Sequence, residues 1–402
     1  MQLSYEKLNA LRGQYGDAFY LLDTEQFRKN FADLKDAFQK IYSNFNIAYS
    51  YKTNYTPALC KIVKELGGYA EVVSEMEMEL AQRVGMENKR IIWNGPVKNQ
   101  TILEPFLLNG GTVNLDNGTE FAFVKSVVEA HPETKFNLGI RCNFDVKDSV
   151  ISRFGFDAEG DEFLAVVNYL KEMPNINFIN LQCHFAKRQI DYWPDRAKGM
   201  VELIDRIGYV PPRVDIGGGL FGNMAESLKV QLGSHIPSYD DYARAAASVF
   251  AEHFTGDKKP ELVIEPGSAL VGDCMKFVAT VKNFKEVRGK YIATALGSQK
   301  NISMSGVNPP MEVFSSGKKQ ENYKDINIVG FTCIEGDMLY KGYNGKLGIG
   351  DMVVFGNCGS YSLVMKPPFI LPNFAVLDIC GDTVRVIKRA ETFDDLFHTF
   401  AF

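Results

Sequence analysis

The segment NIAYSYKTNY, residues 46–55, places a single lysine, Lys52, at the end of a short apolar strand expected over Ile47–Tyr51. Tyrosines alternate there with small residues, as they do on a pleated sheet surface. Partial burial disfavours the ammonium form of a lysine and makes its amine a better nucleophile. Such an amine forms Schiff bases with aldehydes, most commonly with pyridoxal phosphate. A strand-end lysine that simply faces water is the ordinary alternative, and the rest of the chain decides between the two.

A carboxylate at the end of another strand could complete that chemistry. Glu265 ends the apolar run in LVIEPG, residues 262–267. A carboxylate there can pair with a protonated pyridine nitrogen, and the protonated ring then accepts the electrons that CO2 loss leaves behind. An arginine in its place would leave a weaker electron sink, which suits racemisation. A structural ion pair is the alternative for Glu265 taken alone.

Two further strand ends carry residues that could contact a cofactor. Gly217, Gly218 and Gly219 follow the run RVDI, and amides without a neighbouring Cβ can approach a phosphate closely. His184, in LQCHFAKR, could stack its flat ring on the ring of a cofactor. Glycines that only form a turn, and a histidine satisfied within the core, are the alternatives. The remaining strand-end candidates are Glu71, Arg141 and Gly267.

Strands and helices alternate along most of the chain, and this alternation would bring the strand ends together. Helical patterns such as EFLAVVNYLKEM separate eight strand-like segments. Such alternation implies parallel strands joined by crossovers, and eight units close into a barrel with its active site at the carboxyl ends of the strands. The expected strands are NIAYSYKT, YAEVVS, RIIWNG, TVNLD, KFNLGIRC, INFINLQCHF, RVDIGGG and ELVIEPG.

The sequence predicts an α/β architecture of two domains. Residues 24–270 are expected to form a cofactor-binding (β/α)8 TIM barrel, with a helix that begins at a cap formed by Asp23 and Thr24. Past Gly267 the helical pattern stops, and residues 271–402 are expected to form a mostly-β domain that residues 1–23 join through the strand AFYLLD. Its other expected strands are MKFVATVKNF, KYIATALG, INIVGFTCIEG, GDMVVFGNC, NFAVLDIC and TVRVIKR.

Composition narrows the class of protein. A net charge of −5 gives no electrostatic basis for binding nucleic acid or anionic membranes. The seven cysteines form no CxxC pair and no metal-finger spacing, so we expect no metal and a reduced, cytoplasmic setting. The N-terminus lacks the apolar core of a signal peptide, and no apolar run is long enough to span a bilayer.

The motifs, in this order, resemble the fold-type III pyridoxal-phosphate decarboxylases, which include diaminopimelate, ornithine, arginine and carboxynorspermidine decarboxylases and are related to alanine racemase. The resemblance covers nearly the whole chain. It implies that Lys52 forms the Schiff base with pyridoxal 5'-phosphate and that His184 stacks on its ring. It also implies that VDIGGGLFG binds the phosphate and that Glu265 pairs with the pyridine nitrogen. The segments that resemble the family's other cofactor-binding motifs are EVVSEMEMELA, with Glu71, and RCNF with SRFGF, with Arg141.

The β domain resembles the family as well. CIEGD, residues 333–337, is similar to the cysteine motif, which implies that Cys333 protonates the decarboxylated carbon, a step also open to Lys52, and that Asp337 lies near the substrate. GSY resembles a segment whose tyrosine, here Tyr361, reaches the phosphate. In the family the cysteine motif completes the partner subunit's site, so the resemblance implies a homodimer with shared active sites. A buried cysteine acting as a small hydrophobe, and a tyrosine packed in the core, are the alternatives.

Three departures from the family bear on the substrate. Ser268 replaces an arginine, Ile334 replaces an acid that holds a distal ammonium, and Ala186 and Lys187 replace a Gly-Ser pair. We expect Lys187 to supply the phosphate charge that Ser268 lacks, and Lys187 and Arg188 together to suit an anionic distal group on the substrate. Because an unpaired buried ammonium is costly, the departures favour a decarboxylase of a specialised or conjugated amino acid. Diaminopimelate decarboxylation for lysine biosynthesis is the alternative.

The residues disfavour two other classes of protein. A racemase on the same scaffold is disfavoured by Glu265, because a racemase tends to avoid a fully developed electron sink. A non-catalytic cofactor carrier is disfavoured by Cys333, Asp337 and Tyr361, because a carrier needs no site shared between subunits.

Overall fold

The computed structural model describes residues 3–233, 235–304, 306–315, 321–381 and 383–402. These residues fold into two compact units, each built from separate stretches of the chain. The first consists of Asn30–Phe221 and Pro237–Ala269, and the second of Met1–Lys29, Gly222–Ile236 and Leu270–Phe402. No helix in the described ranges is both long and apolar enough to cross a membrane.

The first unit is a closed barrel of eight parallel strands, as the sequence predicts. Its strands follow the order β5-β4-β3-β2-β10-β9-β8-β6, and β6 pairs back with β5 to close the ring. Most strand residues are buried, which explains why the strands read as apolar runs rather than as alternating patterns. The strands are β2 (Phe45–Ser50), β3 (Tyr69–Val72), β4 (Ile91–Trp93), β5 (Thr112–Leu115), β6 (Phe136–Asn143), β8 (Ile176–Gln182), β9 (Arg213–Asp215) and β10 (Glu261–Ile264), with a short β7 (Phe156–Asp157) beside β6.

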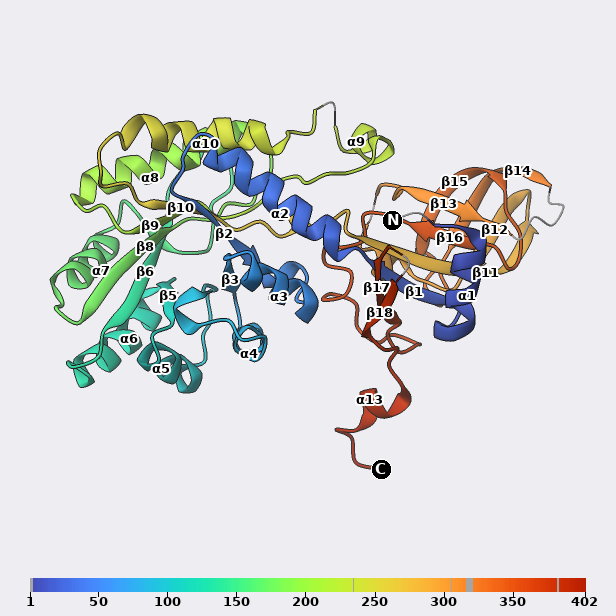
Figure 1. Ribbon diagram of the computed structural model, residues 1–402, viewed down its shortest axis with the longest axis horizontal. Coiled ribbons are helices and arrows are strands. Elements are labelled where there is room, and N and C mark those ends of the chain that lie inside the picture. Colours follow the sequence, from blue (N-terminus) through green and yellow to red (C-terminus); the bar gives the residue numbers. More distant parts are fainter. Residues whose placement is uncertain (1–2, 234, 305, 316–320, 382) are drawn as a thin grey trace. The chain divides into compact units, whose positions relative to one another are not determined.

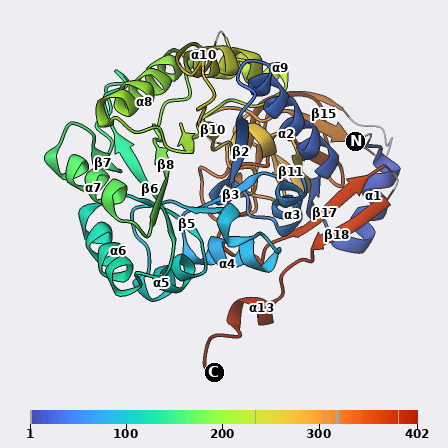
Figure 2. The ribbon, with the colours of Figure 1, turned by 60° about the vertical axis from the view of Figure 1, so that its left-hand side comes forward.

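Helices follow the strands, and in Figure 2 α4 to α8 and α10 lie outside the ring of strands. The helix that precedes β2 begins where the sequence predicts, because the Asp23 carboxylate accepts the Gln26 N–H at 2.9 Å. The helices are α2 (Thr24–Gln39), α3 (Pro57–Glu65), α4 (Glu75–Arg83), α5 (Gln100–Leu108), α6 (Gly118–Ala130), α7 (Asp161–Glu172), α8 (Trp193–Ile207) and α10 (Tyr239–His253). Helix α9 (Glu226–Leu232) belongs to the second unit, and the short α11 (Ser268–Val271) spans the boundary between the units in the chain. Single 3-10 turns are η1 (Tyr51–Thr53), η2 (Asn88–Arg90) and η3 (Ile190–Tyr192).

The second unit is mostly β. Strand β1, from the start of the chain, pairs antiparallel with β11 and parallel with β17, so the expectation that AFYLLD joins this sheet is confirmed (Figure 1). Helix α1 buries Leu8 and Leu11 in the core beneath β1. The elements are α1 (Tyr5–Tyr15), β1 (Ala18–Leu22), β11 (Met275–Val287), β12 (Lys290–Ala295), α12 (Gln299–Ile302), β13 (Met311–Phe314), β14 (Asn322–Val329), β15 (Met338–Lys346), β16 (Met352–Phe355), β17 (Ala375–Cys380), β18 (Thr383–Lys388) and α13 (Phe393–Phe397).

The structure corrects the expected strands of this unit in two places. The segment INIVGFTCIEG is not one strand, because β14 ends at Val329 and the residues that follow form a loop that contains Cys333. Strands β13 and β15 were not predicted. The sequence of β15 contains Gly342 and Gly345, which weaken a strand pattern, and its pairing with β14 is irregular.

Candidate active site

Lys52 lies in the 3-10 turn η1, immediately after strand β2. Its Nζ donates a 2.7 Å hydrogen bond to Oε2 of Glu71, and 34% of the lysine side chain is exposed while Glu71 is buried. The Ser50 hydroxyl donates to the same carboxylate oxygen at 2.6 Å. The amine is therefore accessible to a ligand and held by a fixed carboxylate.

Glu265 is a buried carboxylate, 3% exposed, held by two amide donors. Asn94 Nδ2 donates to its Oε1 at 2.6 Å and Gln182 Nε2 to the same atom at 3.1 Å. Burial alone would raise the pKa of Glu265, but His184, Lys52 and Arg141 hold it below its usual value. The two amide N–H groups act in the same sense, because they stabilise only the ionised form. Glu265 is thus a carboxylate that remains charged inside the barrel.

A row of amide side chains crosses the barrel towards Glu265. Asn180 donates to Asn114 at 2.9 Å, and Asn114 donates to Asn94 at 2.7 Å. Asn94 then donates to both carboxylates of the site, to Glu265 and, at 3.1 Å, to Oε1 of Glu71. Because its oxygen accepts from Asn114 and both of its N–H groups are used, the orientation of the Asn94 amide is fixed. Asn94 therefore links the carboxylate beside Lys52 to Glu265.

His184 stands between Glu265 and the glycine loop. Its Nδ1 accepts the backbone N–H of Gly218 at 2.9 Å and lies 3.5 Å from Oε2 of Glu265. Burial lowers the pKa of His184, and the hydrogen bond and charge of Glu265 oppose that shift. When the ring is neutral, its proton lies on Nε2, because Nδ1 accepts the Gly218 N–H. Burial and the nearby Glu265 raise the pKa of Asp215 well above its usual value, whereas that of Glu265 is lowered, so of the two neighbouring carboxyls Glu265 holds the negative charge more readily.

The glycine loop after β9 is held by hydrogen bonds on most of its polar atoms. Asp215 Oδ1 accepts the Gly217 N–H at 2.9 Å, and the Gly217 oxygen accepts the Glu265 N–H at 2.9 Å. A Cβ on Gly218 would lie 2.2 Å from the backbone oxygen of Glu265, so only glycine fits there. Likewise a Cβ on Gly267 would lie 2.0 Å from Oγ1 of Thr53, beside Lys52. The glycine loop therefore packs directly against the backbone at Glu265, and the chain at Gly267 packs directly against Thr53.

Arg141 is buried at the end of β6. Its guanidinium lies 3.3 Å from Oδ1 of Asp116, which also accepts the Gly155 N–H at 3.2 Å. Behind Asp116 lies a buried ion pair in which Lys98 Nζ and Glu120 Oε1 are 2.5 Å apart. Arg141 therefore holds the SRFGF loop through Asp116, and its NH2 also donates to the backbone oxygen of His184 at 3.4 Å.

The three predicted residues of the second unit differ in their surroundings. Cys333 is exposed in the loop after β14. Asp337 is buried, and its carboxylate accepts the Gln299 N–H at 2.7 Å and the Thr332 hydroxyl at 2.6 Å, so it fixes the loop. Tyr361 is partly buried with a φ of 60°, a left-handed conformation uncommon for tyrosine. Their roles in the site stay predictions.

The residues at the positions where the sequence departs from the family's motifs are mostly accessible to solvent. Lys187 is partly exposed and its backbone oxygen accepts from Arg196, and the exposed Arg188 lies with its guanidinium 5.9 Å from the Phe221 ring. Ile334 is 56% exposed. The proposed contacts of Lys187 and Arg188 with phosphate or substrate stay predictions.

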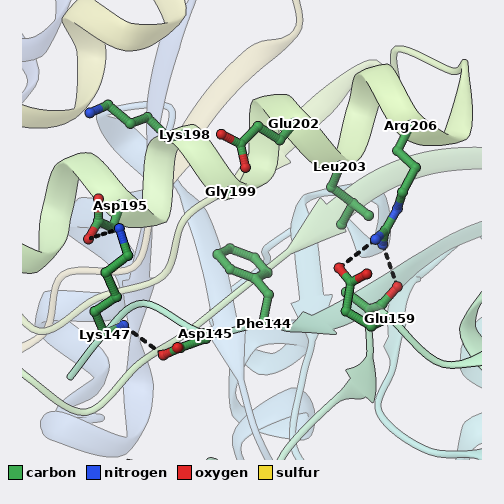
Figure 3. A pocket seen from close by; sticks show the side chains of 11 residues that line it. Phe144, Asp145, Lys147, Glu159, Asp195, Lys198, Gly199, Glu202, Leu203 and Arg206 are labelled. Carbon is green, nitrogen blue, oxygen red and sulfur yellow. Dashed lines mark hydrogen bonds and ion pairs between the residues drawn. The ribbon is translucent and has the colours of Figure 1, made fainter. Parts of the chain in front are cut away.

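A pocket of about 550 Å³ lies elsewhere in the barrel unit, between α8 and the loops after β6 and β7 (Figure 3). Its charged residues largely pair with each other, as Arg206 does with Glu159 at 2.5 Å and Lys147 with Asp195 at 3.9 Å. None of the predicted site residues lines it.

Sequence reasoning missed several residues of the site. Asn94, Gln182 and Asp215 were not among the predicted site residues, although each lies in or just after a barrel strand. Their residue types could have indicated the site. Amide and carboxyl side chains are uncommon in buried strands, and where they occur there they need hydrogen-bond partners. The buried Arg196 of α8 gave no such signal.

Comparisons with known proteins agree with this geometry. Residues 24–272 match the family described as pyridoxal-dependent decarboxylase, pyridoxal binding domain. Among similar proteins, diaminopimelate decarboxylase of Methanocaldococcus jannaschii is 23% identical over 96% of this chain and 91% of its own length. A probable chloroplastic diaminopimelate decarboxylase of rice is 28% identical over 95% of this chain and 79% of its own length.

Solved structures share the fold. The diaminopimelate decarboxylase from M. jannaschii superposes with a TM-score of 0.87 at 20% identity, over 98% of this chain and 94% of that one. The arginine decarboxylase of Paramecium bursaria Chlorella virus gives 0.74 at 21% identity, over 93% of this chain and the whole of the other.

The residues present fit pyridoxal phosphate. An accessible amine, a buried ionised carboxylate, and a loop that a single Cβ would block together provide donors and acceptors for an aldehyde, a pyridine nitrogen and a phosphate. The family match covers more than half of the chain. The chain therefore belongs to the pyridoxal-dependent decarboxylases, and it is a lyase that uses pyridoxal phosphate to release CO2 from an amino acid.

Proposed function

We propose that the substrate of this decarboxylase is diaminopimelate. The observation that carries the proposal is likeness over nearly the full length, at 22–25% identity and across 90–96% of this chain, to diaminopimelate decarboxylases from five archaea and bacteria. This likeness favours diaminopimelate over the specialised amino acid that the departures suggested. It extends beyond the barrel to the β unit, where the substrate-side motif CIEGD lies.

The proposed mechanism assigns the cofactor's two ends to different residues. When bound, pyridoxal phosphate would supply an aldehyde for the substrate amine and a protonated ring that accepts the electron pair left on the substrate carbon as CO2 departs. Lys52 holds the aldehyde end between turnovers, and Glu71 Oε2, 2.7 Å from Nζ, accepts and returns a proton at that nitrogen. Glu265 keeps its negative charge for the ring nitrogen, because Asn94 and Gln182 donate to it and because its pKa is lowered while that of Asp215 is raised.

The β unit would act on a second copy of the chain. We propose that the protein works as a homodimer in which Cys333 of one copy returns the proton to the product in the barrel of the other, with Asp337 holding the cysteine loop. The exposed position of Cys333 supports this role. Mixing Lys52→Ala and Cys333→Ala proteins tests it, because mixed dimers contain one intact site and should recover activity that neither variant shows alone. If the mixture stays inactive, the shared site is wrong.

The substrate is tested by CO2 release from the cofactor-loaded protein, with Lys52→Ala as the blank. The panel contains meso-diaminopimelate, ornithine, lysine, arginine and carboxylated polyamines. We expect release from meso-diaminopimelate and formation of lysine. Loss of optical activity without CO2 would instead identify a racemase and refute the decarboxylase mechanism.

One observation favours a second candidate, a specialised amino acid without a distal ammonium. Ile334, 56% exposed, stands where the family carries an acid, and an apolar side chain cannot neutralise an ammonium. An Ile334→Glu variant separates the candidates. If diaminopimelate is the substrate, the variant should retain or improve its use. If wild type releases CO2 from none of the panel although its cofactor is bound, diaminopimelate is wrong.

A further inference from the structure

Arg196 of α8 is a fully buried arginine next to the glycine loop. Its NH1 donates to the Gly218 oxygen at 2.7 Å, and its NH2 donates to the oxygens of Phe185 and Lys187 at 3.1 and 2.6 Å. One planar guanidinium therefore ties the loop after β9 to the segment that follows His184. Nothing in the sequence around position 196 singles this arginine out.

No carboxylate forms an ion pair with Arg196 in the described part of the chain, and Asp148 acts on its charge only from a longer distance. All of its hydrogen bonds go to backbone oxygens, and no carboxylate lies within 4.0 Å of it. A guanidinium does not lose its proton in proteins, so the cation persists in a region where an unpaired charge is costly. Carbonyl dipoles and the Trp193 ring, 4.8 Å away, offset part of that cost. The remaining positive potential lies immediately beneath the glycine loop.

The contact with Gly218 also decides which way the next amide points. In a trans peptide the C=O and the following N–H point in opposite directions. Because the Gly218 oxygen is turned towards Arg196, the N–H of Gly219 is turned away from it. The amides of Gly217 and Gly218 are occupied by Asp215 and His184, whereas in the described residues the Gly219 N–H has no acceptor. The φ of 90° at Gly219 lets the chain take this course.

We propose that Arg196 is a positioning residue for the phosphate of the cofactor: it fixes the Gly218–Gly219 peptide with its N–H outward and supplies positive charge from behind the loop. An anion on the Gly219 amide would meet both a free donor and the field of a buried cation. This device would replace the charge that Ser268 does not provide. The sequence instead favours Lys187 as the source of the positive charge near the phosphate. One set of variants distinguishes Arg196 from Lys187 as its source.

The test compares binding of pyridoxal phosphate and of pyridoxal, which lacks the phosphate. Wild type, Arg196→Met and Arg196→Lys are stripped of cofactor, and both dissociation constants are measured by absorbance titration. For Arg196→Met we expect the preference for the phosphorylated form to fall about tenfold or more, the scale of one lost charged interaction. Arg196→Lys keeps the positive charge but not the planar set of donors. Its preference for pyridoxal phosphate over pyridoxal should therefore lie between those of wild type and Arg196→Met.

Controls separate positioning from general damage. Arg206→Met removes a cation from the same helix at the pocket of Figure 3, and it should leave the preference unchanged. If Arg196→Met weakens both ligands equally, the residue only maintains the fold and the proposal fails. If Lys187→Ser lowers the preference while Arg196→Met does not, the charge belongs to Lys187. Should Arg196→Met not fold, an unchanged preference in Arg196→Lys would refute the positioning role.

Discussion

Glu77 gives a sharp test of the electrostatics around Lys52. It lies in the first turn of α4, is 5% exposed, and accepts the Val73 N–H at 2.8 Å. Burial raises the pKa of Glu77 to about 7, with Glu71 adding to the shift and the Val73 N–H and Lys52 opposing it. Replacement by glutamine keeps an oxygen for the Val73 amide and removes the titration. We therefore predict that Glu77→Gln stabilises the protein at alkaline pH and not at acid pH.

The size and sign of the effect follow from proton linkage. Below pH 4.5, the ordinary pKa, the carboxyl is protonated in both the folded and the unfolded chain. Between pH 4.5 and about 7 the unfolded chain releases this proton and the folded chain retains it. The free energy of unfolding therefore falls by about 1.4 kcal/mol per pH unit as the pH rises, about 3 kcal/mol in all. Glutamine cannot ionise, so the variant lacks this loss.

The assay is urea unfolding of wild type and Glu77→Gln from pH 4 to pH 8.5, with the difference in unfolding free energy plotted against pH. We expect that difference to rise by about 3 kcal/mol in favour of the variant and to level off above pH 7. Glu75→Gln, an exposed change in the same turn, should show no such rise. A pH-independent difference for Glu77→Gln would refute the reasoning, because it would mean that Glu77 is ionised in the fold like an ordinary surface glutamate.

Three further predictions concern the site and its support. Glu265→Gln keeps the amide contacts but loses the charge, so CO2 release should fall about 100-fold or more while absorbance shows cofactor still bound. Lys98→Met leaves Glu120 buried without its cation and should cost about 3–5 kcal/mol in urea unfolding, and adding Glu120→Leu should restore most of it. Gly218→Ala introduces a clash at 2.2 Å and should lose cofactor on dialysis, whereas Gly256→Ala, in open space, should retain it.

The sequence predicts those features of the fold and the site that follow from the alternation of strands and helices along the chain. Once eight strands alternate with helices, their carboxyl ends must share one side of a barrel, and Lys52, Glu71, His184 and Glu265 follow from their positions in the chain. The structure brings these residues together: Lys52 contacts Glu71, Asn94 contacts both Glu71 and Glu265, and Glu265 lies beside His184.

What the sequence does not predict depends on contacts between distant segments. Arg196 occupies a helical position that reads as an ordinary surface residue, and only the fold shows that its side chain enters the glycine loop. The raised pKa of Asp215 depends on burial and on the proximity of Glu265, which no spacing in the sequence encodes. In the β unit, the sequence pattern predicts a strand that includes Cys333, but this residue lies in a loop. The carboxylate of Asp337 accepts the backbone N–H groups of Gln299 and Thr332 and so stabilises that loop.

The row of amides from Asn180 through Asn114 to Asn94 has a consequence for how protons move. Each amide donates in the same direction, so the dipoles add and their positive ends point at Glu71 and Glu265. Carboxamides, unlike carboxyls or imidazoles, neither take up nor release protons near neutral pH. This row of amides is thus polarised but cannot relay a proton. It orients positive dipole ends towards Glu71 and Glu265 without giving their charges a proton path to Asn180.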